Sequence, residues 1–274
     1  MLKRTLQKRF LGCLIMLSVF AMCCWIVPLN ASSSNDDMAI PPQRLIFASS
    51  EYLPHYGTDL PKQGAMIEII RRAFALQNVQ IEIAFMPFAR ALHDTQQGQY
   101  AGVIAVWHTP ERAAHFLYSD PIYANEIVLF KRANAFNHIS DVAELLRSDG
   151  TLGLVTGYAQ HPVLLQSSLQ KVSVATDAQV FKMLARERVD VVPADLQNGL
   201  YLIAQLPAEL SSTPLDWFLP AIEFKPMHLA FPKNRPESTR LLQQFNLGLR
   251  SLQHSGELEQ ILAELLPQPA AHAP

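Results

Sequence analysis

The sequence alternates twice between short apolar runs and segments with helical spacing, and this alternation constrains the fold more than any other feature. The first series predicts strands at residues 45–48, 79–85 and 103–106. Between them, apolar residues at three- and four-residue steps predict a helix that begins near Gly64, and a second helix spans residues 89–97. Strands and helices in this order are typical of a mostly parallel sheet covered by helices.

A second series of the same kind begins after residue 150. Strands are expected at 152–155, 172–175 and 189–192, and helices at 163–169, 178–187 and 196–204. Two further extended stretches, 127–130 and 227–231, are interpreted as connections that cross between two lobes. Helices at 238–252 and 257–266 complete the chain. The sequence therefore predicts an α/β protein of two lobes, with a cleft between them that binds a small ligand and closes by a hinge motion.

The first 31 residues have the organisation of a secretory signal peptide. Four basic residues, the last of them Arg9, precede an apolar run over residues 10–29. Cleavage is expected after Ala31, although Leu29 stands where a small residue is preferred. An uncleaved anchor stays open as the alternative, since about 20 apolar residues can span a bilayer. Cleavage removes all three cysteines of the chain, which excludes thiol catalysis in the mature protein.

Composition and motifs exclude several classes of function. A formal charge of −2 and a pI near 6.5 argue against a nucleic-acid partner. The nine histidines form no HxxxH or HExxH group, and the chain contains no GxSxG, GxGxxG or phosphate-binding loop with its lysine. We therefore expect no metal, no cofactor and no catalytic residues.

Two charged residues stand where a ligand would bind. Arg112 follows the strand predicted at 103–106, in the kind of loop where open α/β sheets bind ligands. Its guanidinium can hold a carboxylate through two parallel hydrogen bonds, and the alternative is a surface arginine paired with Glu111 or Asp120. Asp195 directly precedes the helix predicted at 196–204, so it can cap that helix, bind a ligand, or do both.

Residues 109–123 read TPERAAHFLYSDPIY, with Thr109, Arg112, Phe116, Ser119, Pro121 and Tyr123 in the order T-x-x-R, F-x-Φ-S-x-P-Y. This segment resembles the family 3 extracellular solute-binding proteins, the periplasmic substrate-binding proteins of polar-amino-acid ABC transporters. Three further matches follow in family order: GLVTG at 153–157, RVDVVPAD at 188–195 and HSGEL at 254–258. The resemblance implies the two-lobed periplasmic-binding-protein-like fold of type II, with a hinge of two crossover strands.

On this resemblance the chain divides into six segments. These are a signal peptide at 1–31, a flexible leader at 32–43, lobe 1 at 44–125 and 226–268, lobe 2 at 126–225, and a disordered tail at 269–274.

The resemblance also implies roles for single residues. It implies that Arg112 binds the ligand α-carboxylate and that Asp195 binds the α-ammonium. Thr156 and Gly157, expected at a helix N-terminus, would add backbone N–H donors. Aromatic walls of the ligand pocket are expected from Tyr52, Trp107, Tyr123 and Tyr158. The sequence departs from the family where Ala105 and Trp107 replace small polar residues, so the pocket is expected to be more apolar.

These expectations define a function. We expect a monomeric, non-enzymatic periplasmic protein that closes on a small zwitterionic or carboxylate-bearing solute and passes it to an inner-membrane ABC permease. Two alternatives stay open. One is an enzyme on the same scaffold, similar to cyclohexadienyl dehydratase-like lyases. The other is a ligand-sensing module that acts on a membrane partner.

Overall fold

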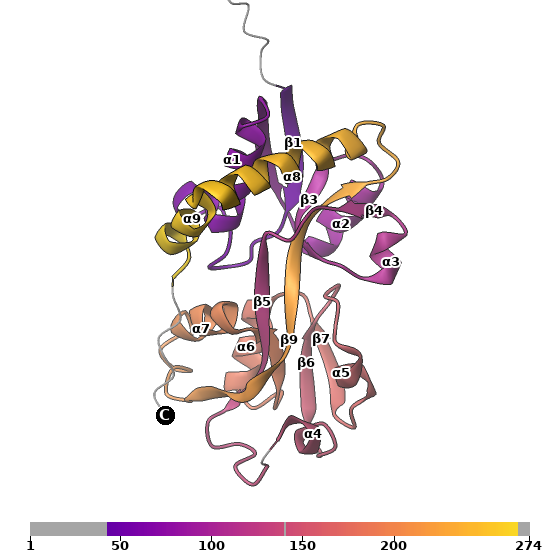
Figure 1. Cartoon of the computed structure of the whole chain (residues 1–274). Coiled ribbons are helices and arrows are strands. Elements are labelled where there is room, and N and C mark those ends of the chain that lie inside the picture. Colours follow the sequence, from indigo (N-terminus) through magenta and orange to yellow (C-terminus); the bar gives the residue numbers. More distant parts are fainter. Residues whose placement is uncertain (1–42, 140, 268–274) are drawn as a thin grey trace, which may run out of the picture. The chain divides into compact units, whose positions relative to one another are not determined.

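The computed structural model describes residues 43–139 and 141–267, which form two α/β lobes joined by the long strands β5 and β9 (Figure 1). The predicted signal peptide, the leader up to residue 42 and the tail at 269–274 lie outside the described residues. Gln43, the last residue assigned to the leader, is the first residue of β1.

The first lobe contains the parallel part of the main sheet. Its strands are β1 (Gln43–Ser49), β2 (Val79–Phe85) and β3 (Gly102–Trp107), and β1 pairs in parallel with both neighbours. The short strand β4 (Phe116–Tyr118) pairs antiparallel with β9. The helices of this lobe are η1 (Pro61–Gln63), α1 (Ala65–Ala75), α2 (Phe88–Gln96), α3 (Pro110–Ala113), α8 (Ser238–Ser255) and α9 (Glu257–Leu265).

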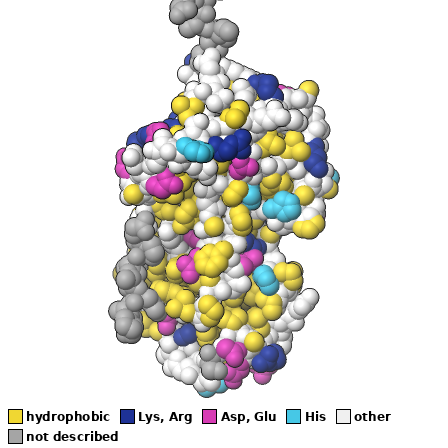
Figure 2. All heavy atoms as spheres, viewed as in Figure 1, with side chains coloured by type: hydrophobic (Ala, Val, Ile, Leu, Met, Phe, Trp, Pro, Cys, Tyr) yellow, Lys and Arg dark blue, Asp and Glu magenta, His cyan; other side chains and the backbone are white. Residues whose placement is uncertain are grey.

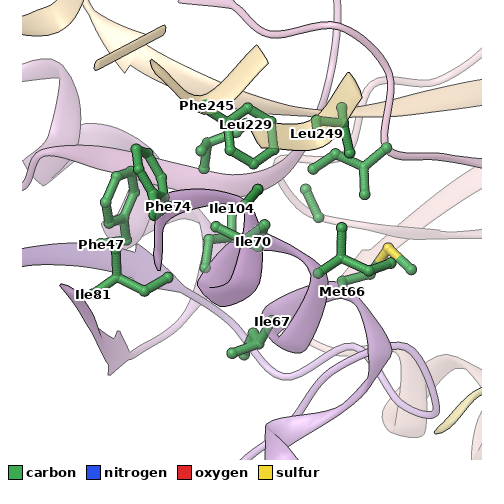
Figure 3. Close-up of a cluster of buried hydrophobic side chains, with 14 of the residues drawn as sticks. Phe47, Met66, Ile67, Ile70, Phe74, Ile81, Ile104, Leu229, Phe245 and Leu249 are labelled. Carbon is green, nitrogen blue, oxygen red and sulfur yellow. The ribbon is translucent and has the colours of Figure 1, made fainter. Parts of the chain in front are cut away.

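The core of the first lobe forms where α1 and α8 meet the sheet. Phe74 of α1 lies with its ring centre 5.4 Å from those of both Phe47 and Phe245, and all three side chains are fully buried (Figure 3). Burial of each such side chain stabilises the fold by about 1.5–3 kcal/mol. The two helices pack closely because Gly248 of α8 has no Cβ. A Cβ at this position would lie 2.0 Å from the carbonyl oxygen of Ala73.

The strands β5 (Tyr123–Arg132) and β9 (Leu215–Pro232) cross between the lobes as an antiparallel pair. β9 also pairs with β3, and β5 pairs with β8 (Val192–Asp195), so the sheet has the order β2-β1-β3-β9-β5-β8. The β3–β9, β5–β9 and β5–β8 pairings are antiparallel. The prediction of a mostly parallel sheet holds for β1, β2 and β3, from which it was made, and is wrong for the pairings of β9, β5 and β8. Periodicity along the chain identifies a strand. It does not indicate whether that strand pairs parallel or antiparallel with a strand that is distant in sequence.

The second lobe completes the alternation. Its small parallel sheet pairs β6 (Thr151–Val155) with β7 (Gln170–Val174), and its helices are α4 (Val142–Leu145), α5 (Pro162–Gln166), α6 (Asp177–Ala185) and α7 (Leu196–Ala204). Phe130 and Phe181 pack edge to face in its core, with ring centres 5.1 Å apart.

Several element boundaries differ from the predictions. The strand expected at 189–192 begins only at Val192, and the backbone N–H groups of Asp190 and Val191 just before it both donate to the carbonyl of Thr151. The helix expected at 163–169 ends at Gln166. The strand at 79–85 and the helix at 196–204 are confirmed to the residue.

The surface in Figure 2 carries charged side chains of both signs, scattered among polar and apolar ones. Within the described ranges, no helix is both long enough and apolar enough to cross a membrane.

Candidate functional site

A pocket lies where the strand ends of the first lobe face Tyr158 of the second lobe. It is lined by Ser50, Tyr52, Tyr56, Phe88, Ala105, Trp107, Arg112, Tyr158 and Met227. Arg112 is the one charged side chain among these lining residues. A cationic group on an otherwise aromatic and apolar wall is suited to a small ligand that combines an anion with an apolar body.

The backbone of β3 contributes to this pocket. Ala105 has a φ of +56°, and the pairing of β3 with β9 shifts register between Val103 and Val106. A positive φ is costly for any residue with a Cβ, and such backbone strain clusters at binding and catalytic sites. The strained residue itself lines the pocket.

Arg112 is held in place by both lobes. Its backbone N–H donates to the Oγ1 of Thr109, which caps α3. Its guanidinium donates through Nη1 to the carbonyl of Trp107 (3.0 Å) and through Nη2 to the carbonyl of Gly157 in the second lobe (2.7 Å). The guanidinium also lies over the ring of Phe88, 5.5 Å from its centre. Partial burial lowers the pKa of Arg112, yet an arginine stays charged at any physiological pH.

Two features of Arg112 favour a ligand role over the surface alternative. Asp120, a partner considered for a surface arginine, pairs instead with Arg250 at 2.8 Å. Each terminal nitrogen of Arg112 also carries a second N–H besides the one that bonds a carbonyl, so the side chain keeps donors for a carboxylate.

Tyr158 is a residue of the second lobe that forms part of the aromatic wall of the pocket. Its ring stands edge to face against Trp107, Phe88 and Tyr52, with centre distances of 5.6, 5.8 and 6.3 Å. Its hydroxyl donates to the carboxylate of Asp177, the first residue of α6, at 2.7 Å. Burial raises the pKa of Asp177, and burial together with the nearby Asp177 charge raises the pKa of Tyr158. Asp177 thus positions the tyrosine that closes one side of the pocket.

Asp195 lies behind His55 and Tyr52 and accepts hydrogen bonds from three buried residues. Its Oδ1 accepts from the ring Nε2 of His55 (2.7 Å) and from the backbone N–H of Asn198 (2.9 Å), and its Oδ2 accepts from Asn125 (3.0 Å). The contact with Asn198 confirms that Asp195 caps α7. His55 is 0% exposed and Asp195 1%, so this cluster is sealed from solvent.

A second pocket adjoins the first and shares Tyr52, Trp107 and Tyr158 with it. Its charged lining residues are Asp177, Glu223 and Lys225. Lys225 pairs with Glu223 at 3.1 Å and lies over the ring of Trp107, 4.7 Å from its centre. Burial lowers the pKa of Lys225.

The structure brings together four of the eight residues predicted for the site: Tyr52, Trp107, Arg112 and Tyr158. Tyr123 stands 5.4 Å from His55, ring centre to ring centre, and neither it nor Asp195 lines either pocket.

The prediction of a helix N-terminus at Thr156 and Gly157 is wrong. Gly157 turns the chain with a φ of +86°, and α5 starts only at Pro162. The N–H of Thr156 donates to Val174, and Gly157 contributes its carbonyl, which accepts from Arg112.

Sequence reasoning missed His55, Tyr56, Asn125, Asp177 and Lys225. For Asp177 a local signal existed, because Thr176 followed by an aspartate is typical of a helix start. His55 and Asn125 act through Asp195, which is distant in sequence, and no local pattern marks them. Among the residues that the structure describes, no group of three or more histidine, cysteine, aspartate or glutamate side chains could hold a metal ion.

Comparison with known proteins identifies the family. Residues 47–268 match the model of the bacterial extracellular solute-binding proteins, family 3, so the chain belongs to this family, as the motifs predicted. A comparison with curated proteins gave no match.

Solved structures share the two-lobed fold. A histidine kinase sensor domain with similarity to periplasmic binding proteins aligns with a TM-score of 0.71 and 18% identity, covering 82% of this chain and 97% of that one. The substrate-binding protein of an amino acid ABC transporter aligns with a TM-score of 0.69 and 17% identity, covering 82% and 100%. The ancestral amino-acid-binding protein AncCDT-1, a precursor of cyclohexadienyl dehydratase, aligns with a TM-score of 0.64 and 16% identity, covering 82% and 95%. At these identities the likeness establishes the fold alone.

Proposed function

We propose that this protein is a periplasmic solute-binding protein whose lobes close on a small carboxylate-bearing solute, anchored by Arg112, for delivery to an ABC importer. Membership of the extracellular solute-binding family supports an exported protein that binds a small molecule. The observation that carries the proposal is the position of Arg112. Its guanidinium lines an aromatic pocket and at the same time bonds to the second lobe through Gly157.

This position couples binding to closure. A carboxylate that accepts from the remaining N–H groups of Arg112 would lie between Trp107 of the first lobe and Gly157 of the second. Charge-assisted bonds of an arginine to a carboxylate are about twice as strong as neutral ones. Ligand contacts made by both lobes favour the closed arrangement, because a ligand shifts an equilibrium only by its differential affinity for the two states.

Calorimetric titration of the mature protein with a panel of carboxylates and amino acids tests this proposal. Arg112→Lys keeps the charge but loses the planar fork, so affinity should fall about 10-fold or more. Arg90→Lys is the matched control, because Arg90 is exposed on α2 and lines neither pocket. Equal affinity in both variants and the wild type would remove Arg112 from the binding site.

The mass of the exported protein tests the delivery role. Loss of residues 1–31 would leave a mature protein that is free to meet a permease, as the proposal requires. A form that retains the apolar run at 10–29 would favour the sensing alternative instead.

A further inference from the structure

The carboxylate of Asp195, which the family resemblance assigns to a ligand ammonium, is bonded to donors of the protein itself. Its two oxygens accept three hydrogen bonds, from His55, Asn125 and the N–H of Asn198. All three partners are buried, and Asp195 itself is 1% exposed. An ammonium could reach this carboxylate only by displacing a side chain that is part of the same molecule.

The aromatic wall separates this cluster from the ligand pocket. Tyr52 lines the pocket and stacks on His55, with ring centres 5.4 Å apart and planes inclined by 16°. His55 also contacts Tyr123, and neither His55 nor Asp195 lines either pocket. The imidazole therefore fills the space next to Asp195, and the ring of Tyr52 covers it.

The carboxylates that do line the pockets are engaged as well. Asp177 accepts from the hydroxyl of Tyr158 at 2.7 Å, and Glu223 pairs with Lys225 at 3.1 Å. Arg112 differs from these carboxylates, because its terminal nitrogens keep N–H donors that can bond an anion. The site thus offers Arg112 as a partner for a negative group, whereas each lining carboxylate already holds a neighbouring side chain, Tyr158 or Lys225.

From this arrangement we infer that the pocket takes amine-free carboxylates with a flat apolar body, such as arylalkanoates, and that His55 is the residue that rejects α-amino acids. This inference rests on the proposed function, because it assumes that Arg112 binds the ligand carboxylate. Rings of Tyr52, Phe88, Trp107 and Tyr158 would pack against the apolar body, as aromatic groups do at centre distances of about 4.5–7 Å. A bound α-ammonium would lie in this apolar wall without a counter-charge, which is costly.

Matched ligand pairs test the inference directly. Calorimetric titration compares 3-phenylpropanoate with L-phenylalanine, which differs only by the α-ammonium. For the wild type we expect 3-phenylpropanoate to bind about 10-fold more tightly or better, because an amino acid must displace His55 or leave its own charge unpaired. In His55→Ala the carboxylate of Asp195 becomes accessible, so L-phenylalanine should gain about 10-fold relative to 3-phenylpropanoate.

Two further variants serve as controls. His55→Gln keeps an N–H donor at a similar reach and should retain the wild-type preference. His93→Ala changes an exposed histidine on α2, 69% exposed, and should leave both affinities unchanged.

These outcomes distinguish a failure of the inference from a failure of the proposed function. If L-phenylalanine binds the wild type as tightly as 3-phenylpropanoate or more tightly, the inference is wrong while the carboxylate site stands. An unchanged preference in both His55 variants also overturns the role of His55. If neither ligand binds while another carboxylate of the panel does, the inference is wrong and the proposed function stands. If Arg112→Ala binds carboxylates as the wild type does, the proposed function fails together with the inference.

Discussion

Replacement of Asp195 by alanine should destabilise the protein far more than the loss of an ordinary helix cap. The carboxylate accepts from three donors that lie on different elements: His55 after β1, Asn125 in β5 and the first turn of α7. Each donor is at most 2% exposed, so water cannot replace the lost acceptor. A buried donor left without a partner costs about 1–3 kcal/mol. Since the three costs overlap as the site relaxes, the expected loss is about 3–6 kcal/mol.

Asp195→Asn should fall between the wild type and the alanine variant. Asparagine is an efficient cap, and its Oδ1 can still accept from Asn198 and His55. Its amide nitrogen, however, would face the donating Nδ2 of Asn125. The amide of Asn125 cannot simply rotate, because the Oδ1 of Asn125 accepts from the indole N–H of Trp107 at 2.9 Å. One lost bond of this kind predicts a cost of about 1–3 kcal/mol.

Urea unfolding monitored by tryptophan fluorescence and by far-UV circular dichroism measures these losses. Thr176→Ala is the matched control, because Thr176 caps α6 at 3.3 Å from the N–H of Gln179 but is exposed to solvent. It should cost about 1 kcal/mol. If Asp195→Ala costs no more than Thr176→Ala, the carboxylate does not hold three buried donors and the reasoning is refuted.

Two further predictions concern stability. Gly248→Ala should destabilise the protein by about 1–3 kcal/mol despite the higher helix propensity of alanine, because the new Cβ would lie 2.0 Å from the carbonyl oxygen of Ala73. Thermal unfolding beside Leu247→Ala, at a 51% exposed position on the same helix, checks this, and a small effect of the glycine change would contradict the close packing of α1 and α8. Asp177→Asn should gain stability relative to the wild type as the pH rises from about 4 towards 7. The pKa of Asp177 is raised by burial, so the wild type loses stability as the pH rises from the unfolded pKa through the folded one, and asparagine does not. Melting temperatures of both proteins across this range measure the difference, which should be constant if Asp177 titrates normally.

The architecture was largely predictable because it follows from local periodicity. The alternating run at 79–85 and the amphipathic segment after Gly64 each bury one face on the same core, and both elements form where the spacing predicted them. Strand direction was not predictable in this way. The course of β9 back along β3 and β5 depends on pairing between segments far apart in sequence.

The site was predictable only where position in an element determines function. Trp107 ends β3 and Arg112 follows in α3, and the loop after a strand end in an α/β sheet is already a candidate for ligand binding. The contact of His55 with Asp195 joins residues 140 positions apart, and no local pattern in the chain indicates it. The family motif predicted Asp195 as a ligand residue, but its burial behind His55 and Tyr52 emerges only from the packing of the two lobes.

The most direct test of the account is a crystal structure of the mature protein saturated with 3-phenylpropanoate. We expect the carboxylate of this ligand to lie within hydrogen-bond distance of the Arg112 guanidinium and its phenyl ring to lie among Tyr52, Trp107 and Tyr158. The bond between His55 and Asp195 should remain intact. A ligand bound away from Arg112, or one whose binding separates His55 from Asp195, would contradict it.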